Sequence, residues 1–280
     1  MVIAKLKQKL RRILEDSGID CADFETEQLL KWCIGDRYYI TDSMEEISEE
    51  REQKLTNAAV MRAKGEPLQY IIGEWDFYGF TFKVGRGVLI PRQETEVLVE
   101  KVLPFLNEGS AVIDLCSGSG CIPIAIAKKS KADCFGVEIS KDAIGYFEEN
   151  VKLNSAENKV RIVESDVLNP TQEALELLPK QADLITANPP YLTAEEMENL
   201  QKEVRREPEL ALFGGKDGLD FYRIIFEKWK VLLKPKGIFA VEVGDRQGEE
   251  VREIMTAAGF EAQIFKDYSG IPRVVLGEKS

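Results

Sequence analysis

The residues Asn188-Pro189-Pro190-Tyr191 form a short motif that can hold a planar nitrogen carrying two hydrogens. The Asn188 side-chain oxygen and the Pro189 carbonyl can each accept one N–H bond, and Tyr191 can form a flat wall beside the substrate. An amide or exocyclic amine nitrogen is a poor nucleophile because its lone pair is delocalised. Two acceptors that fix it opposite an electrophile would supply much of the rate, and they would stabilise the charge developing in the transition state.

This chemistry needs no strong base before attack, because the amide nitrogen becomes acidic once it has formed its new bond and can then lose a proton to water. The sequence agrees, since it contains no histidine, the commonest general base and transition-metal ligand. Its five cysteines include no CxxC pair and are interpreted as reduced thiols. We therefore expect a site without a metal. The alternative interpretation of the motif is a rigid exit turn after a strand.

A second candidate site is a glycine turn between a predicted strand and a predicted helix. Small residues at such a place let the backbone approach a ligand closely. Pro123 stands where a dinucleotide GxGxxG motif has its third glycine, so a nicotinamide cofactor is disfavoured. A structural tight turn is the alternative. The candidate cofactor-binding residues of the turn are Asp114, Cys116, Ser117, Gly118, Ser119 and Gly120.

Acidic residues follow the next two predicted strands. Glu138 ends a strand about 20 residues past the glycine turn, where a carboxylate can accept hydrogen bonds from two ribose hydroxyls. Asp166 and Val167 stand at the end of the following strand, where they can contact the adenine amino group and its face. Each acid alone is more often a solvated loop residue or a helix cap than a ligand-binding residue. Because ligands of open α/β sheets gather at the carboxyl ends of the strands, the three positions together predict a nucleoside cofactor.

The elements that position these residues alternate between strand and helix in the second part of the chain. Such alternation predicts a doubly wound, mostly parallel sheet with helices on both faces. Two apolar segments around Gly270 predict an antiparallel strand at the end. The expected strands are 111–115, 134–139, 160–165, 182–188 and 237–243, and the expected helices are 95–103, 121–129, 141–153, 172–178, 218–233 and 247–258.

The first part of the chain has apolar residues at helical spacing, which predicts a small helical domain over residues 1–73. One of its helices is expected over 48–64. Aromatic and β-branched residues then indicate a hairpin linker over 74–87, and the α/β domain should occupy 88–280. A length of 280 residues suits one α/β core with an accessory domain.

Charge and hydropathy exclude several classes of protein. A formal net charge of −12 disfavours stable binding to bare nucleic acid, whose affinity comes largely from Lys and Arg at phosphates. Lysines interrupt the first ten residues, where a signal peptide needs an apolar run, and no apolar stretch approaches the roughly 20 residues of a membrane span. We therefore expect a cytoplasmic protein without nucleic-acid or membrane partners. A monomer is expected as well, although charge and hydropathy do not decide the oligomeric state.

Several segments together resemble the HemK/PrmC family of peptide chain release factor N5-glutamine methyltransferases, a branch of the Rossmann-like S-adenosylmethionine methyltransferases. The resemblance extends over nearly the whole chain, and the IPRQETE and GGKDGLDFYR sequences are its most specific parts. NPPY alone also occurs in amine methyltransferases that act on DNA and RNA. The segments are EPLQYIIG (66–73), VLIPRQETEVLVE (88–100), DLCSGSGCI (114–122), NPPY (188–191), EPELALFGGKDGLDFYR (207–223), EVGDRQ (242–247) and KDYSGIPRVVLG (266–277).

The resemblance implies a seven-stranded, mostly parallel sheet and a methyl transfer that converts S-adenosyl-L-methionine to S-adenosyl-L-homocysteine. Its implied substrate is the glutamine in the GGQ motif of class I release factors, a protein that the helical domain would help to hold. The cofactor pocket would be lined by Cys116 to Gly120, Glu138, Val167 and Asn188, with Asn188 to Tyr191 around the glutamine and Arg92 and Glu94 ordering a loop over the site.

Two alternatives to this function remain open in the sequence. The first is a nucleic-acid exocyclic-amine methyltransferase using the same NPPY chemistry, although no basic target-reading insertion supports it. The second is a non-catalytic binding module that keeps the fold without the activity. The complete NPPY motif and Glu138 count against the second. One departure from the family pattern is Cys116, which stands where family glycine loops often begin with Gly.

Overall fold

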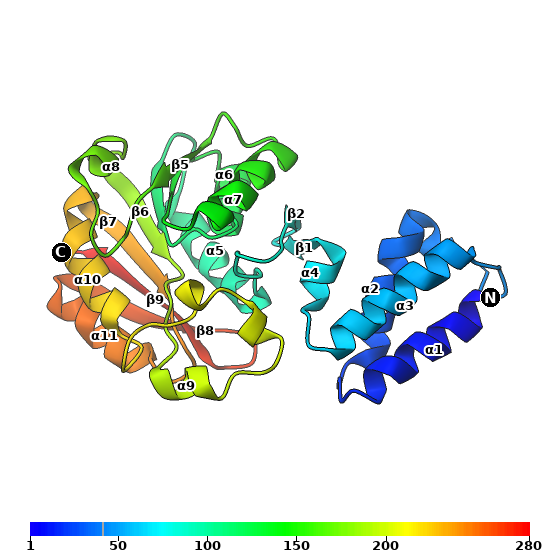
Figure 1. The fold of residues 1–280 in the computed structure, drawn as a ribbon. Helices are drawn as coiled ribbons and strands as arrows, with labels where there is room; N and C mark the ends of the chain where they lie inside the picture. The colour runs from blue at the N-terminus through cyan, green and yellow to red at the C-terminus, as the bar shows by residue number, and fades with distance from the viewer. Residues whose placement is uncertain (41) are drawn as a thin grey trace. The chain divides into compact units, whose positions relative to one another are not determined.

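The protein, described here by a computed structural model for residues 1–40 and 42–280, folds into two compact units (Figure 1). The first unit consists of Met1–Gly73 together with Gln201–Arg206. The second consists of Glu74–Leu200 and Glu207–Ser280. The chain therefore passes from one unit to the other three times.

The first unit is helical because its apolar residues recur on one side of each predicted helix. In the first helix, for example, Ile3, Leu6, Leu10 and Leu14 are buried. The third helix begins after Ser48, whose hydroxyl accepts a hydrogen bond from the amide of Arg51. The elements are α1 (Ile3–Glu15), α2 (Ala22–Ile34), η1 (Gly35–Ile40), α3 (Glu49–Ala63) and α4 (Leu68–Ile72).

A buried ion pair holds the short segment Gln201–Arg206 within the first unit. Arg62 Nε on α3 donates to Glu25 Oε2 on α2 at 2.7 Å, and both side chains are buried. Arg62 Nη2 also donates to Glu203 Oε1 at 3.2 Å. A buried charge is costly unless it is paired, so Arg62 ties Glu203 and its neighbours to the two helices.

The second unit is built on a seven-stranded sheet in the order β5-β4-β3-β6-β7-β9-β8. The first five strands of this order pair in parallel, whereas β9 is antiparallel to both of its neighbours. This confirms the predicted mostly parallel sheet and its antiparallel close. The strands are β3 (Ala111–Leu115), β4 (Asp133–Glu138), β5 (Val160–Glu164), β6 (Ala182–Ala187), β7 (Leu233–Glu242), β8 (Phe260–Lys266) and β9 (Pro272–Lys279).

Helices cover both faces of this sheet. Successive strand residues point to opposite faces, so both faces carry apolar side chains that a helix layer buries. Val112 packs with the cluster around α5 and α6, whereas Ile113 packs with the cluster around α10 and α11. The helices are α5 (Glu96–Val102), α6 (Cys121–Ser130), α7 (Lys141–Leu153), α8 (Gln172–Glu176), α9 (Ala194–Glu198), α10 (Asp220–Trp229) and α11 (Gly248–Ala257), with short 3₁₀ helices η2 (Gln93–Thr95), η3 (Leu103–Phe105), η4 (Val204–Arg206, in the first unit), η5 (Glu209–Ala211) and η6 (Lys230–Leu232).

The predicted hairpin consists of β1 (Glu74–Phe77) and β2 (Phe80–Lys83), and it packs within the second unit. Its two-residue turn has positive φ at both Tyr78 and Gly79, as in the type I′ turns that favour hairpins. Phe77 and Phe82 are buried in the same cluster as α5 and α6. The Asn150 side chain on α7 also accepts a hydrogen bond from Lys83 N and donates one to Lys83 O, so the hairpin is anchored to the sheet domain.

The structure corrects two expectations about elements. Strand β7 begins at Leu233 rather than at residue 237, because the Pro235 to Gly237 sequence, typical of a turn, is accommodated by a register irregularity against β6. The region between residues 192 and 212, for which no elements were expected, contains α9, η4 and η5. These elements are too short to leave a periodic pattern in the sequence.

Candidate active site

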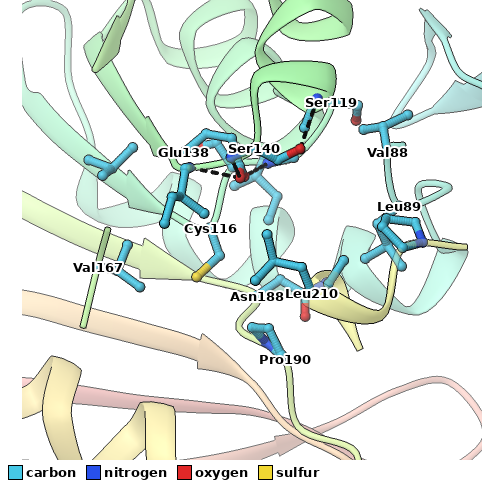
Figure 2. A pocket seen from close by; sticks show the side chains of 18 of the residues that line it. Val88, Leu89, Cys116, Ser119, Glu138, Ser140, Val167, Asn188, Pro190 and Leu210 are labelled. Carbon is cyan, nitrogen blue, oxygen red and sulfur yellow. Dashed lines mark hydrogen bonds between the residues drawn. The ribbon is translucent and has the colours of Figure 1, made fainter. Parts of the chain in front are cut away.

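A cavity of about 230 Å³ lies in the second unit at the carboxyl ends of β3, β4, β5 and β6. Figure 2 shows Glu138 and Ser119 on one side of this space and Asn188 and Pro190 on the other. The topology therefore brings together the residues that follow four neighbouring strands. Of the residues predicted from the sequence, those that line the cavity are Arg92, Cys116, Ser117, Gly118, Ser119, Glu138, Asp166, Val167, Asn188 and Pro190.

Five predicted site residues are placed elsewhere in the described chain than in the lining of this cavity. Glu94 is exposed, and Asp114 lies fully buried beneath the glycine turn. Gly120 and Pro189 are buried, and these two residues and Tyr191 are each adjacent in sequence to a residue that lines the cavity. Any contact of these five with a ligand would have to come from backbone groups or from ligand atoms beyond the cavity.

Asp114 holds the glycine turn from below. Its carboxylate accepts a hydrogen bond from Ser117 Oγ at 2.7 Å and another from Thr186 Oγ1 on β6 at 2.6 Å. Burial raises the pKa of Asp114 to about 7, although both hydrogen bonds oppose that shift. The residue therefore fixes the turn between β3 and α6 and is interpreted as a support rather than a ligand.

The glycine turn depends on backbone conformations that ordinary residues avoid. Gly118 and Gly120 have φ of 54° and 79°, and a Cβ at Gly120 would lie 2.1 Å from the Phe147 ring. Only glycine fits at position 120. Cys116, which stands where the family often has Gly, also has a positive φ of 58°, a conformation that costs a non-glycine residue roughly 1–2 kcal/mol. Burial raises the pKa of its thiol, so the Cys116 sulfur enters the lining as a neutral group.

Glu138 is held by three backbone amides at the end of β4. Its Oε2 accepts from Gly118 N at 2.8 Å, and its Oε1 accepts from Ile139 N at 2.9 Å and from Ser140 N at 2.8 Å. A carboxylate has about four acceptor positions. The fixed carboxylate therefore keeps acceptor capacity toward the cavity, which is what recognition of a sugar hydroxyl requires.

The turn after β5 supplies a polar and an apolar group to the same cavity. Asp166 Oδ1 accepts a hydrogen bond from Leu168 N at 2.8 Å, which closes a local turn. Val167 is buried, and its carbonyl accepts a hydrogen bond from the indole Nε1 of Trp229 on α10 at 2.9 Å. This second contact fixes the position of Val167 on the cavity wall.

The NPPY motif begins directly after β6 and is held from two sides. Asn188 Nδ2 donates to Thr95 Oγ1 at 3.4 Å, which leaves Asn188 Oδ1 as the acceptor for a ligand. On the far side, Gln247 Nε2 donates to the carbonyl of Tyr191 at 2.9 Å. Gly214 packs against the same backbone, where a Cβ would lie 2.6 Å from Pro190 O. The motif is thus positioned by Thr95 of η2, by Gln247 directly before α11, and by the GGKDG loop (residues 214–218).

Three polar residues near the site were not singled out in the sequence. Glu207 is buried, accepts a hydrogen bond from Ile90 N at 3.0 Å, and forms an ion pair with Arg92. Thr95 contacts Asn188, and Glu242 is buried at the end of β7. Their only signal was membership of the segments IPRQETE, EPELALF and EVGDRQ that carry the family resemblance. In a single sequence each of these three residues is typical of an ordinary surface charge or hydroxyl.

Known proteins match the chain over both of its units. The family model described as PrmC N-terminal domain matches residues 5–73, and the model described as TRM5/TYW2 methyltransferase domain matches residues 78–210. The release factor glutamine methyltransferase of Geobacter sulfurreducens is 39% identical over 280 residues, which cover 98% of this chain and 96% of the relative. The protein of that name from Thermodesulfovibrio yellowstonii is 43% identical over 84% of each chain.

The chain belongs to the release factor glutamine methyltransferase family. Membership makes it a methyltransferase and confirms the resemblance found in the sequence. The crystal structure of a methyltransferase from Pyrococcus furiosus has a TM-score of 0.55 at 15% identity and covers 83% of this chain and 100% of that one, which shows the shared fold. Among the residues of this chain that the structure describes, no helix has the length and apolar character needed to cross a membrane.

Proposed function

We propose that this protein transfers a methyl group from S-adenosyl-L-methionine to the side-chain amide N5 of the glutamine in the GGQ motif of class I release factors. The observation that carries the proposal is the placement of the Asn188 acceptor in the cavity that Glu138 and the glycine turn also line. An acceptor for a carboxamide and an acceptor for a nucleoside sugar therefore face one space. The relatives are named release factor glutamine methyltransferases, which supports the proposal.

The cavity residues fit the proposed cofactor group by group. Glu138 can accept from ribose hydroxyls, Val167 offers an apolar surface to the adenine face, and Asp166 lies beside it as an acceptor for the adenine amino group. The turn from Cys116 to Ser119 provides small side chains and open backbone for the amino-acid part. When bound, S-adenosyl-L-methionine supplies an electrophilic methyl on a sulfonium sulfur.

The chain's own residues prepare the amide for attack. Asn188 Oδ1 and the Pro189 carbonyl accept the two N–H bonds of the glutamine amide and aim its nitrogen at the methyl carbon. Transfer of that methyl would place positive charge on the amide nitrogen, where these two acceptor dipoles would stabilise it. The nitrogen then loses one proton to water, leaving N5-methylglutamine and S-adenosyl-L-homocysteine. Tyr191 lies outside the cavity lining, next to Pro190, and in this proposal it borders the part of the substrate that extends beyond the cavity.

We propose that the first unit, Met1–Gly73 with Gln201–Arg206, binds the parts of the release factor other than the glutamine itself. Its match to the PrmC N-terminal domain supports this assignment. Arg92, paired with Glu207, orders the segment that precedes Thr95 at the cavity wall. The protein acts as a monomer in the cytoplasm, where release factors work, and requires no nucleic-acid partner.

The test is a labelling assay in which the purified protein and methyl-labelled S-adenosyl-L-methionine meet several substrates side by side. A class I release factor, the same factor with its GGQ glutamine replaced by alanine, tRNA and duplex DNA are compared. We expect label in the unaltered release factor alone. Label in tRNA or DNA would support exocyclic-amine methylation, and label that persists in the alanine variant would move the target to another residue.

A further inference from the structure

The Gln247 side chain, in the turn between β7 and α11, hydrogen-bonds backbone groups of the NPPY motif, of the GGKDG loop and of its own turn. Its Nε2 donates to the carbonyl of Tyr191 at 2.9 Å and to the carbonyl of Gly218 at 3.3 Å. Its Oε1 accepts from the amide of Gly244 at 3.0 Å. Both donors and the acceptor oxygen of this side-chain amide are therefore engaged with backbone.

The partners determine which way the Gln247 amide is turned. A backbone N–H can only donate, so the end that faces Gly244 is the oxygen. Two backbone carbonyls can only accept, so the end that faces Tyr191 and Gly218 is the NH2 group. Gln247 is itself held by its main chain, because its N–H donates to the Gly244 carbonyl at 3.0 Å and its carbonyl accepts from Val251 N at 2.9 Å.

Two glycines allow the Gln247 amide to approach the motif closely. Gly218 has a positive φ of 74°, and a Cβ there would lie 2.3 Å from the Tyr191 carbonyl oxygen and 2.5 Å from Gln247 Nε2. A Cβ at Gly244 would lie 2.8 Å from Gln247 Oε1 and 3.3 Å from Cδ2 of the Tyr191 ring. The GGKDGLDFYR and EVGDRQ segments therefore share a structural task, since each contributes a glycine to the place where Gln247 meets NPPY.

The contact with Gln247 leaves the motif with a defined set of free acceptors. The Tyr191 carbonyl is occupied by Gln247, and the Leu192 carbonyl accepts from Gly214 N at 2.9 Å. Within the described part of the chain, no donor is hydrogen-bonded to the Pro189 carbonyl. The backbone acceptor that remains available is thus the one proposed to hold the substrate amide.

The same contact fixes the far end of the motif. The near end continues directly from β6, and the proline rings hold φ at about −65° at positions 189 and 190. Neither the sheet nor a proline ring fixes the peptide group that follows Tyr191. The hydrogen bond from Gln247 to the Tyr191 carbonyl holds this peptide group, so the motif is constrained along its whole length.

We propose that Gln247 is a positioning residue for methyl transfer, which fixes the NPPY backbone so that the Pro189 carbonyl stays directed to the substrate amide. This inference rests on the proposed function of the motif. Gln247 is not among the residues that line the cavity, so it acts through the motif and not on the substrate or the cofactor. A displacement of about 1 Å in such a holding group costs about 100-fold in rate.

The kinetic test compares Gln247→Glu and Gln247→Met with the wild-type protein on a release factor substrate. Gln247→Glu keeps the shape and the acceptor but loses both donors, and Gln247→Met loses all three hydrogen bonds without adding a charge. We expect kcat to fall by about 10–100-fold in both variants, while the cofactor Kd stays within about threefold of wild type. Gln263→Glu, the same change at an exposed position of β8, is the matched control and should behave like wild type.

Gly218→Ala tests the same contact from the other partner. Its Cβ would press on both the Tyr191 carbonyl and Gln247 Nε2, so we expect the same fall in kcat with an intact Gln247 side chain. Urea unfolding of each variant shows whether it is folded under the assay conditions. A folded variant that loses cofactor affinity in proportion to kcat would contradict a role confined to the motif.

A spectroscopic measurement reads the contact without turnover. The Tyr191-Leu192 pair is the only Tyr–Leu sequence in the chain, so labelling with carbonyl-¹³C tyrosine and ¹⁵N leucine gives one correlated signal. Loss of the hydrogen bond from Gln247 should move the carbonyl ¹³C resonance of Tyr191 upfield in Gln247→Met. The same resonance should stay in place in Gln263→Glu.

The two measurements separate this inference from the proposed function. An upfield shift with a lowered kcat on the GGQ glutamine would support both. An upfield shift in a protein that methylates no glutamine would overturn the proposed function and leave Gln247 as the residue that positions the motif. Methylation of glutamine with an unchanged kcat in Gln247→Glu and Gln247→Met, or a Tyr191 resonance that does not move in Gln247→Met, would overturn the positioning role.

Discussion

The Glu138 carboxylate at the end of β4 and the Gly118 amide after the neighbouring strand β3 are joined by a hydrogen bond of 2.8 Å. With the amides of Ile139 and Ser140 on its other oxygen, Glu138 is fixed before any ligand arrives. The bond also couples the glycine turn to the proposed ribose site. A change at Glu138 should therefore affect cofactor binding in two ways, through the lost acceptor and through the released turn.

Glu138→Gln should weaken S-adenosyl-L-methionine binding by about 10–100-fold, because hydrogen bonds to a charged group contribute roughly 1.5–3 kcal/mol. In the wild type, backbone amides donate to both carboxylate oxygens of Glu138. The glutamine side chain has only one acceptor oxygen, so its NH2 group would face at least one backbone N–H. Isothermal titration calorimetry measures the change in Kd. Glu261→Gln, an exposed change on β8, is the matched control and should bind like wild type. An unaltered Kd in Glu138→Gln would remove Glu138 from the cofactor site.

Asn188→Ala should leave the cofactor Kd within about threefold of wild type and lower kcat by about 100-fold or more. The reason is that a preorganised hydrogen-bonding group at the reacting centre contributes roughly 2.7–4 kcal/mol to the transition state. Rapid-quench single-turnover assays with saturating release factor report the chemical step directly. A variant with unchanged single-turnover rate would show that the Asn188 oxygen does not hold the amide.

Gly214 allows the GGKDG loop to approach the NPPY motif. A Cβ at this position would lie 2.6 Å from both Pro190 O and Tyr191 Cα, which are backbone atoms that cannot move aside alone. Gly214→Ala should therefore displace the motif and lower turnover by about 10–100-fold, with a loss of stability of about 1–3 kcal/mol from overpacking. Turnover and urea unfolding measure the two effects.

Gly145→Ala provides the contrast, because position 145 lies within α7 and a Cβ there would meet no atom within 4 Å among the described residues. Alanine in a helix is favoured over glycine by about 0.5–1 kcal/mol. This variant should be as active as wild type and slightly more stable. Equal losses in the two variants would contradict the proposed packing of Gly214 against NPPY.

The stability of the protein should decrease as the pH rises from about 4 to about 7. Burial raises the pKa of Glu242 to about 7, above its unfolded value of about 4.3, so the folded state binds more protons than the unfolded state between these limits. The stabilisation is complete below the unfolded pKa and is lost as the pH passes the folded one. Asp114, with its pKa also raised to about 7, contributes with the same sign.

Glu242→Gln should remove its share of this pH dependence. Urea unfolding at about pH 5 and about pH 8 should show a variant that gains roughly 2–3 kcal/mol on wild type between the two conditions. Glu278→Gln, an exposed change on β9, should keep the wild-type slope. If Glu242→Gln kept that slope as well, the carboxyl would not be a strained buried acid.

Much of the fold could be predicted from sequence because its signals are local. Strand 111–115 and helix 141–153 coincide with β3 and α7, since each is a periodic apolar run bounded by a glycine or a cap. Positions after strands also follow from topology, which is why Glu138 and Asn188 could be expected at one edge. The start of β7 was missed because Pro235 and Gly237 are typical of a turn, and here a sheet irregularity accommodates them.

The supporting residues could not be predicted for a different reason. Thr95 and Glu207 lie about 90 and 20 residues from Asn188 in sequence, and their significance comes only from contacts made in the folded chain. Nothing in the residue type marks Glu207 as buried, since Glu is ordinarily exposed. Glu94, by contrast, was singled out and is exposed in the structure, so its role in ordering the loop remains a prediction.

The most direct test of the account is fragmentation mass spectrometry of the release factor after reaction with the wild-type protein and with Asn188→Ala. The account predicts one added methyl group, located on the side-chain amide nitrogen of the GGQ glutamine, and its near absence with Asn188→Ala. A methyl group on any other residue, or equal methylation of that glutamine by both proteins, would contradict it.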